Sequence, residues 1–416
     1  KGKYHMMLQY FENLESGINN AIKENPESAS ARKRYTIEIA RLGKRLYSDT
    51  DRKAWAGALV PFDLLNTMGV TSCYAEFMAS VLVSTDIGME LLENAEQTGY
   101  ASDTCGYHRA IIGAAHKCLM PIPEFLISTT SPCTGGQAVL ENLARLFKRD
   151  LFVIHIPQDE SDQSVNFLAD QIEDMVEFVA NHTGSPLDKN KQCKAIENTN
   201  KAREVMSDVY NLAKQVPSPA NGRDLSNFGI VMPLFFGTEA AVEIAQFYRD
   251  EFKSRINANN SGVPGESLRL MWLQNRIQFK NTLVKMLESE YKAAIVIDEL
   301  NDITWDPIDP NDPYVGLARR SISSPLHGTA KRRIKHIIEL AEAYRIDGAI
   351  NPCHWGCRQG TGARGLIDSS MKEIGVPVLN LEVDCVDRRN FAEGQLITRI
   401  EAFMEMIESH PSPWKK

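Results

Sequence analysis

The sequence predicts an α/β protein with two doubly wound domains, Rossmann-like or flavodoxin-like, a helical insertion between them and an N-terminal helical arm. Short apolar segments typical of buried parallel strands alternate with segments of helical period, first after the arm and again over the last part of the chain. At 416 residues the chain is also too long for one core. We therefore expect four parts: a helical arm (1–52), a first α/β domain (53–162), a helical segment (163–262) and a second α/β domain (263–416).

The arm has helical periodicity and a break at Asn25-Pro26, followed by the charged run ARKRYTIEIARLGKRLY. Proline disfavours the helical conformation of the residue before it, so the arm is predicted to be two helices. We expect this arm to pack on a partner or on the rest of the chain.

The first α/β domain begins near Lys53 with an apolar start, a turn at Pro61 and a helix that ends near Gly69, followed by a short strand. Further on, EFLISTTS and LFVIHIP are predicted strands on either side of the helix QAVLENLARLF. Cys133 lies in a Pro-Cys-Thr-Gly-Gly turn after the first of these strands and before the helix.

Another cysteine of this domain, Cys105, is predicted to lie in the first turn of a helix that runs through Ile112. Asp103 or Thr104 precedes it and is suited to cap that helix. Unpaired N–H groups and the helix dipole favour a thiolate at such a position.

Strand patterns fade between about residues 163 and 260, where helical periods dominate. The polar stretch NANNSGVPGE is then predicted to be a linker. After it, SLRLMWL, AAIVIDEL, DGAIN and PVLNLEVD are predicted strands separated by helices, which gives the second α/β domain.

The loop DGAINPCHWGCRQGTG (347–362) joins two elements of this second domain and carries Cys353 and Cys357. It runs from the end of a predicted strand to the start of a predicted helix. Open α/β sheets hold ligands in such loops, because backbone N–H groups converge there. Cys357 therefore has the same kind of position as Cys133.

Composition excludes several classes of protein. The chain has 46 basic and 54 acidic residues, a net charge of −8, and no Lys/Arg run, which argues against nucleic-acid binding. No apolar run approaches the roughly 20 residues of a membrane span, and the first residues lack an apolar signal segment, so a cytoplasmic location is expected. The dinucleotide, Walker and nucleophile-elbow motifs are missing.

Eight cysteines are scattered over the chain, which favours metal or redox duty over a disulfide framework. Cys105, Cys133 and Cys357 are placed to meet in the crevice between the domains. Three thiolates can hold a [4Fe–4S] cubane with one iron left open. Burial as a small apolar side chain is the plainer explanation for the others on helix or strand faces: Cys73, Cys118 and Cys193.

A zinc site is less well supported, because Cys353 and Cys357 are spaced C-x3-C and the nine histidines are dispersed. Three further residues are adjacent in sequence to the proposed ligands: His108, His354 and Arg358. We expect them to hydrogen-bond cluster sulfurs or turn backbone. The sequence identifies no catalytic acid or base.

Four motifs together resemble the 2-hydroxyacyl-CoA dehydratase and benzoyl-CoA reductase superfamily, of the D-component type. They are HWGCRQ (354–359), LEVDCVDRRNFAEGQLITRIEAFMEM (381–406), TCGYHRA and TSPCTGG. The resemblance runs from about Lys53 to the C-terminus. It implies an oxygen-sensitive subunit whose [4Fe–4S] cluster is bound by three cysteines, here Cys105, Cys133 and Cys357, with Cys353 at no ligand position.

The resemblance also implies partners and a reaction. An ATP-hydrolysing iron–sulfur activator docks on a dimer of homologous or identical subunits and injects one electron. In the dehydratases this electron passes to the thioester carbonyl of an acyl-CoA, and the resulting ketyl radical expels the hydroxyl group. A related branch is a homodimeric double-cubane [8Fe–9S] reductase of small molecules, which the long N-terminal arm keeps open. A third hypothesis is a cluster-free binding or assembly protein with the same fold.

Overall fold

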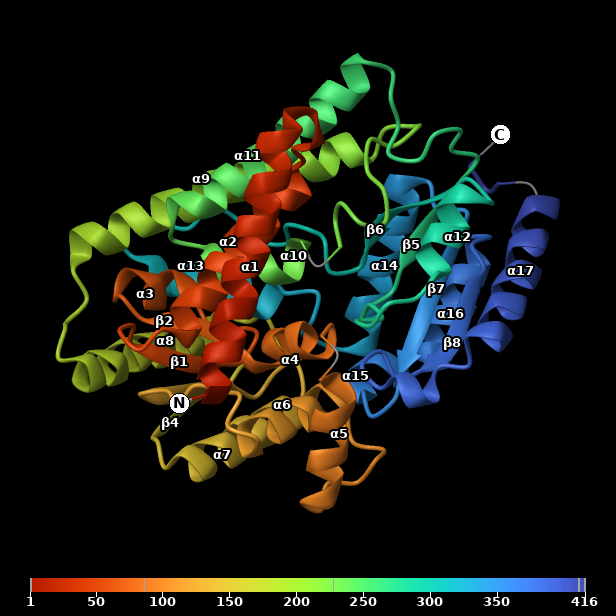
Figure 1. The fold of residues 1–416 in the computed structure, drawn as a ribbon. Helices are drawn as coiled ribbons and strands as arrows, with labels where there is room; N and C mark the ends of the chain where they lie inside the picture. The colour runs from red at the N-terminus through yellow and green to blue at the C-terminus, as the bar shows by residue number, and fades with distance from the viewer. Residues whose placement is uncertain (1, 86, 227, 411, 415–416) are drawn as a thin grey trace.

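The computed structural model describes residues 2–85, 87–226, 228–410 and 412–414. It confirms the predicted α/β class, because the strands of these ranges form two four-stranded sheets surrounded by helices (Figure 1). Every pair of neighbouring strands is parallel, in the orders β2-β1-β3-β4 and β6-β5-β7-β8. The strand order reverses between β1 and β3 in one sheet and between β5 and β7 in the other. Ligands of open α/β sheets bind outside the carboxyl ends of the strands at such a reversal.

The first sheet is buried on both faces, as expected for parallel strands covered by helices. At its centre the side chain of Trp55 is 1% exposed, and its indole N–H donates to the Pro121 carbonyl at 3.0 Å. The strands are β1 (Lys53–Ala56), β2 (Thr71–Tyr74), β3 (Phe125–Thr129) and β4 (Leu151–Ile154), and the helices are α3 (Phe62–Thr67), α4 (Ala75–Val83), α5 (Gly88–Gln97), α6 (Gly106–His116) and α7 (Thr134–Phe147).

The second sheet repeats this arrangement, with β6 buried along its whole length. Its strands are β5 (Leu268–Trp272), β6 (Ala293–Asp298), β7 (Gly348–His354) and β8 (Val378–Val383), and its helices are α12 (Leu283–Ser289), α13 (Pro313–Ser323), α14 (Ala330–Tyr344), α15 (Arg358–Thr361), α16 (Arg364–Glu373) and α17 (Glu393–Ser409). Helix α13 was absent from the sequence prediction, and it packs on α8 (Asp162–Thr183).

The helical arm and the helical middle segment pack together above the first sheet (Figure 1). The predicted break at Asn25-Pro26 is a short 3-10 turn between α1 (Gly2–Glu24) and α2 (Ala31–Tyr47). Helix α2 packs on α11 (Glu239–Asn257), which lies along α9 (Lys189–Ala213). Between α9 and α11 run α10 (Phe228–Val231) and the 3-10 turn Met232–Phe235. The arm therefore packs on the chain itself.

Elements from distant parts of the chain are joined by a buried ion pair. Arg320 on α13 donates through both terminal nitrogens to the carboxylate of Asp63 on α3, at 3.1 and 2.5 Å. The same carboxylate accepts the hydroxyl of Thr199 on α9. Asp63 is 0% exposed, so the pair is held by these partners rather than by water.

Within the described ranges, no helix combines the length and apolar character required to cross a bilayer. The division of the chain at residues 52, 162 and 262 stays a prediction.

Candidate functional site

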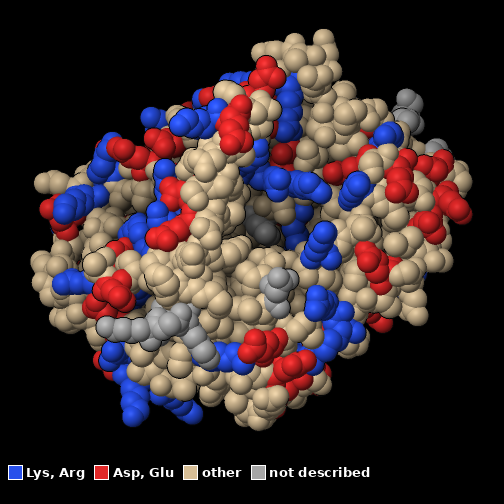
Figure 2. Space-filling model, in the orientation of Figure 1, with Lys and Arg blue, Asp and Glu red and all other residues tan. Residues whose placement is uncertain are grey.

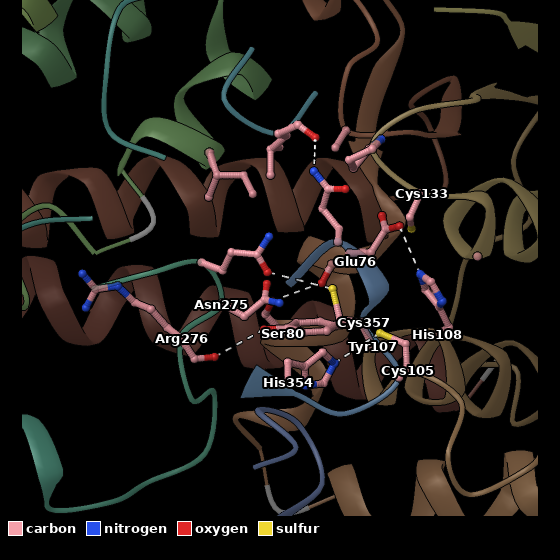
Figure 3. A pocket seen from close by; sticks show the side chains of 18 of the residues that line it. Glu76, Ser80, Cys105, Tyr107, His108, Cys133, Asn275, Arg276, His354 and Cys357 are labelled. Carbon is pink, nitrogen blue, oxygen red and sulfur yellow. Dashed lines mark hydrogen bonds and ion pairs between the residues drawn. The ribbon is translucent and has the colours of Figure 1, made fainter. Parts of the chain in front are cut away.

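The three cysteines singled out in the sequence line one cavity of about 700 Å³. Its walls come from α4, α6 and the β3–α7 loop on one side, and from the β5–α12 and β7–α15 loops on the other. Figure 2 shows that this face of the molecule is hollowed near its centre, and Figure 3 shows the cysteine side chains from close by. The cavity therefore takes residues from both α/β halves.

Each of the three cysteines is the N-cap residue of a helix: Cys105 of α6, Cys133 of α7 and Cys357 of α15. The sulfur of Cys133 accepts the backbone N–H of Gly136 at 3.3 Å, and that of Cys357 accepts the N–H of Gly360 at 3.2 Å. First-turn N–H groups have no partner within their helix, so a sulfur at this position satisfies them.

Strand order accounts for the matching positions of Cys133 and Cys357. Cys133 follows β3 and Cys357 follows β7, each the third strand of its sheet and next to the point where the order reverses. Cys105 departs from the prediction. It lies between α5 and α6, does not directly follow a strand, and is itself the N-cap, because the helix starts after Cys105 rather than after Asp103 or Thr104.

His354, at the end of β7, connects the two halves of the site. Its Nδ1 accepts the backbone N–H of Cys385 at 2.9 Å, so the ring proton lies on Nε2, which is 3.3 Å from the Cys105 sulfur. Burial lowers the pKa of His354 to about 4, which keeps the ring neutral. His354, which the sequence places near Cys357, thus has its side-chain contact with Cys105.

The loops that carry Cys105 and Cys357 approach each other through Gly356. This glycine has φ +72°, and a Cβ atom there would lie 2.4 Å from the backbone nitrogen of Cys105. Such a distance excludes any side chain, so the contact between the two loops requires glycine.

His108, on the first turn of α6, lies beside Cys133. Its Nε2 is 3.6 Å from a carboxylate oxygen of Glu76 (Figure 3). Burial lowers the pKa of His108, but hydrogen bonds with Cys133 and Glu76 outweigh burial and raise it to about 9. The ring of His108 is therefore favoured in its cationic form next to the Cys133 sulfur.

The thiol of Cys105 differs in charge from what its predicted helix position suggested. Burial raises the pKa of Cys105 well above its ordinary value, and the nearby Cys357 adds to this effect. Burial also raises the pKa of Cys357, and the nearby Cys133 raises it further. For Cys105 and Cys357, burial therefore outweighs the effect of the helix N-terminus on the pKa of the thiol. Coordination by a metal removes the proton and reverses this balance.

Among the described residues, no group of three or more His, Cys, Asp and Glu side chains is placed to hold a single metal ion. A cubane is larger than one ion, and each of its irons takes its own terminal ligand. Three soft sulfur donors spread around one cavity, each beside N–H groups, therefore fit a cluster better than a single ion.

The other member of the C-x3-C pair lies away from the cavity. Cys353 is 2% exposed, and its thiol donates to Asn380 Oδ1 at 3.4 Å. Cys385 is buried beside the Asn275 carbonyl, at 3.8 Å, and is not a lining residue. Cys118, expected to be buried, is exposed in a turn after α6.

Two residues of the cavity wall remain: Arg358, which the sequence indicated, and Gln274, which it did not. Arg358 is exposed at the wall, and its guanidinium makes no ion pair or hydrogen bond with the described residues. Gln274 was missed, although its Oε1 lies 4.0 Å from the Cys357 sulfur, because 83 positions separate the two residues. No local pattern around Gln274 indicates this contact.

A buried cluster of ion pairs lies next to the site, between α6 and the loop that follows β8. Arg109, on α6 and 0% exposed, lies 2.6 Å from Glu96, 3.1 Å from Asp384 and 3.2 Å from Asp387. Arg389 binds Glu96 and Asp387 as well. The cluster fixes the helix that follows Cys105 against the loop after β8, and so joins the halves beside His354.

Comparisons with known proteins identify the family of the chain. Residues 58–407 match the family model described as 2-hydroxyglutaryl-CoA dehydratase, D-component. The chain is 24% identical to the (R)-phenyllactyl-CoA dehydratase alpha subunit of Clostridium sporogenes, over 86% of this chain and 90% of that protein. It is 23% identical to the alpha subunit of lactoyl-CoA dehydratase from Anaerotignum propionicum, with the same coverage. It is 22% identical to one of the subunits of benzoyl-CoA reductase from Thauera aromatica, over 84% of this chain and 86% of that protein.

Proposed function

Because the chain belongs to the 2-hydroxyglutaryl-CoA dehydratase D-component family, we propose that it is the iron–sulfur subunit of an enzyme of the dehydratase and reductase kind. It accepts low-potential electrons from an ATP-hydrolysing iron–sulfur activator, for radical dehydration of a 2-hydroxyacyl-CoA or reduction of an aryl-CoA. The observation that supports this proposal most is the single cavity lined by three helix-capping cysteines.

In this proposal Cys105, Cys133 and Cys357 hold a [4Fe–4S] cluster, which supplies one-electron transfer at low potential. The sulfur of Cys105 accepts from His354, and those of Cys133 and Cys357 accept backbone N–H groups. The N-terminal ends of α6 and α7 also favour the added negative charge.

A second subunit is part of the proposal. The relatives include both an alpha and a beta subunit of (R)-phenyllactyl-CoA dehydratase, and the chain is similar to each. We therefore propose a dimer with a homologous subunit, which the activator meets in an anaerobic cytoplasm. Size and composition of the complex purified anaerobically from its own cells test this point, and a stable dimer of this chain alone that binds no acyl-CoA contradicts it.

The alternative is a homodimeric double-cubane [8Fe–9S] reductase of small molecules driven by the same kind of activator. One observation favours it: the helices α1 and α2 precede the matched range 58–407 and pack on the body of the chain. An additional sulfide per pair of chains, above the count for two separate cubanes, supports this alternative.

Iron and sulfide analysis after anaerobic reconstitution tests the cluster itself. The wild-type chain is expected to be brown and to hold iron, and Cys357→Ser is expected to lose most of it. Cys353→Ser is the matched control, because its sulfur lies outside the cavity four positions away. A wild-type chain without iron, or a Cys357→Ser variant with the full content, would support the cluster-free hypothesis instead.

A further inference from the structure

Gln274, just after β5, has an unusual backbone conformation. Its φ is +55°, in the left-handed region that residues other than Gly, Asn and Asp rarely adopt. Two hydrogen bonds hold the flanking backbone: Leu273 N–H donates to the Ile350 carbonyl at 2.9 Å, and the Trp272 indole donates to the Asn275 carbonyl at 2.9 Å. Strain of this kind is retained where the surrounding structure imposes it, often at functional sites.

The conformation directs the side chain of Gln274 toward Cys357. The residue is 7% exposed, lines the cavity, and has its Oε1 4.0 Å from the Cys357 sulfur. Space for the amide depends on Gly360, since a Cβ atom there would lie 2.4 Å from the same Oε1. The backbone conformation of Gln274 and the lack of a side chain at Gly360 thus bring the Gln274 amide close to the Cys357 sulfur.

The chemistry of this contact depends on whether Cys357 carries its proton. A thiol donates to the amide oxygen, whereas a coordinated cysteine is a thiolate that only accepts. A half-turn of the Gln274 amide about its last bond presents Nε2–H to the same sulfur. We infer that Gln274 donates a hydrogen bond to the Cys357 sulfur in the cluster-loaded protein and raises the reduction potential of the cluster. This inference rests on the proposed function.

A donor at a ligand sulfur stabilises the additional negative charge of the reduced cluster, and hydrogen bonds to sulfur are among the factors that set such potentials. The other glutamine amides of the cavity wall are already engaged elsewhere. Gln278 Nε2 donates to the Tyr107 hydroxyl at 2.9 Å, and Gln359 Nε2 donates to the Leu326 carbonyl at 3.0 Å. Gln274 is therefore a positioning residue with a distinct partner.

The test compares reduction potentials of anaerobically reconstituted protein, measured by redox titration followed by electron paramagnetic resonance. Gln274→Met keeps the length of the side chain but removes the donor, and Gln274→Glu replaces it with an acceptor. Both are expected to bind iron and to show a more negative potential, with the larger shift for Glu. Gln278→Met, a cavity amide without a sulfur partner, is the matched control and is expected to keep the wild-type potential.

A second variant approaches the same contact from the other side. Gly360→Ala leaves Gln274 in place but pushes its amide from the sulfur, and a shift in the same direction is expected. Equal potentials in wild type, Gln274→Met and Gly360→Ala, with full iron content, overturn the inference and leave the proposed function standing. Wild-type protein that takes up no iron overturns both.

Discussion

The Nε2 atom of His354 lies 3.3 Å from the sulfur of Cys105, a residue 249 positions earlier in the chain. The other ring nitrogen is occupied by the N–H of Cys385, so the direction of the Nε2–H bond is fixed. One neutral imidazole thus joins a helix start on the first half of the site to a strand end on the second.

Replacement of His354 by Ala is expected to lower the free energy of unfolding by about 2–4 kcal/mol, because it opens a cavity and leaves the buried Cys385 N–H unpaired. Urea unfolding measures this loss, and iron retention is expected to fall with it. The exposed His116, at the end of α6, is the control, and His116→Ala is expected to stay within about 0.5 kcal/mol of wild type. Equal losses in the two variants contradict the role assigned to His354.

Arg109→Met is expected to cost about 3–5 kcal/mol in unfolding free energy, since it leaves the buried carboxylate of Asp384 without its cation and removes one of the two arginines that bind Asp387. Arg41→Met is the control, because Arg41 pairs with Glu15 at the surface, where its side chain is 53% exposed. That change is expected to cost about 1 kcal/mol or less. Thermal or urea unfolding of both variants decides whether the ionic cluster joins the halves.

Gly356→Ala is expected to destabilise the chain by about 1–3 kcal/mol, because the new methyl group meets the backbone of Cys105 and the residue has φ +72°. Iron content after reconstitution is expected to fall as well, since the two ligand loops move apart. Gly365 on α16 has open space at the Cβ position, so Gly365→Ala is expected to leave stability unchanged or slightly higher. The prediction fails if both variants unfold at the same urea concentration.

The loop before Cys133 gives a pH-dependent prediction. His327 accepts the Ser131 hydroxyl at Nδ1 and donates from Nε2 to the Pro157 carbonyl, each at 2.7 Å. Burial lowers the pKa of His327 and Arg332 lowers it further, while the hydrogen bond to the Pro157 carbonyl and the charge of Glu160 oppose this. The folded protein therefore binds the proton more weakly than the unfolded chain does.

Stability contributed by neutral His327 is fully present above the unfolded pKa of about 6.5 and is lost as the pH falls toward the lower folded value, by at most about 1.4 kcal/mol per pH unit. His327→Asn keeps an acceptor for Ser131 but does not titrate. Between about pH 7.5 and about pH 5.5, wild type is expected to lose more unfolding free energy than His327→Asn. Parallel losses would show that His327 does not carry this dependence.

Sequence patterns were sufficient where structure follows from local chemistry. The strand–turn–helix patterns around Cys133 and Cys357 predicted two equivalent positions, because parallel strands end at one edge of their sheet. The start of α13 at Asp312-Pro313 is an ordinary helix start that was overlooked. The predicted start of α6, after Asp103 or Thr104, was one or two residues too early, which is the usual uncertainty of a helix end.

Contacts that depend on packing between the halves could not be predicted. Gln274 and Arg109 lie in segments without a distinctive motif, and their partners come from elsewhere in the chain. Burial also reversed the expected charge of the Cys105 thiol, since a helix start alone predicts a thiolate and the depth of the site is a tertiary property.

The distribution of the three cysteines along the chain has a consequence for biosynthesis. When the last strand of the first sheet has been synthesised, Cys105 and Cys133 are already part of the nascent chain. β7 and the loop that carries Cys357 are still to be translated. His354 and the carboxylates that bind Arg109 are synthesised later than both of these thiols. Any cofactor that needs all three sulfurs must therefore be inserted after β7 and the loop that carries Cys357 have been translated.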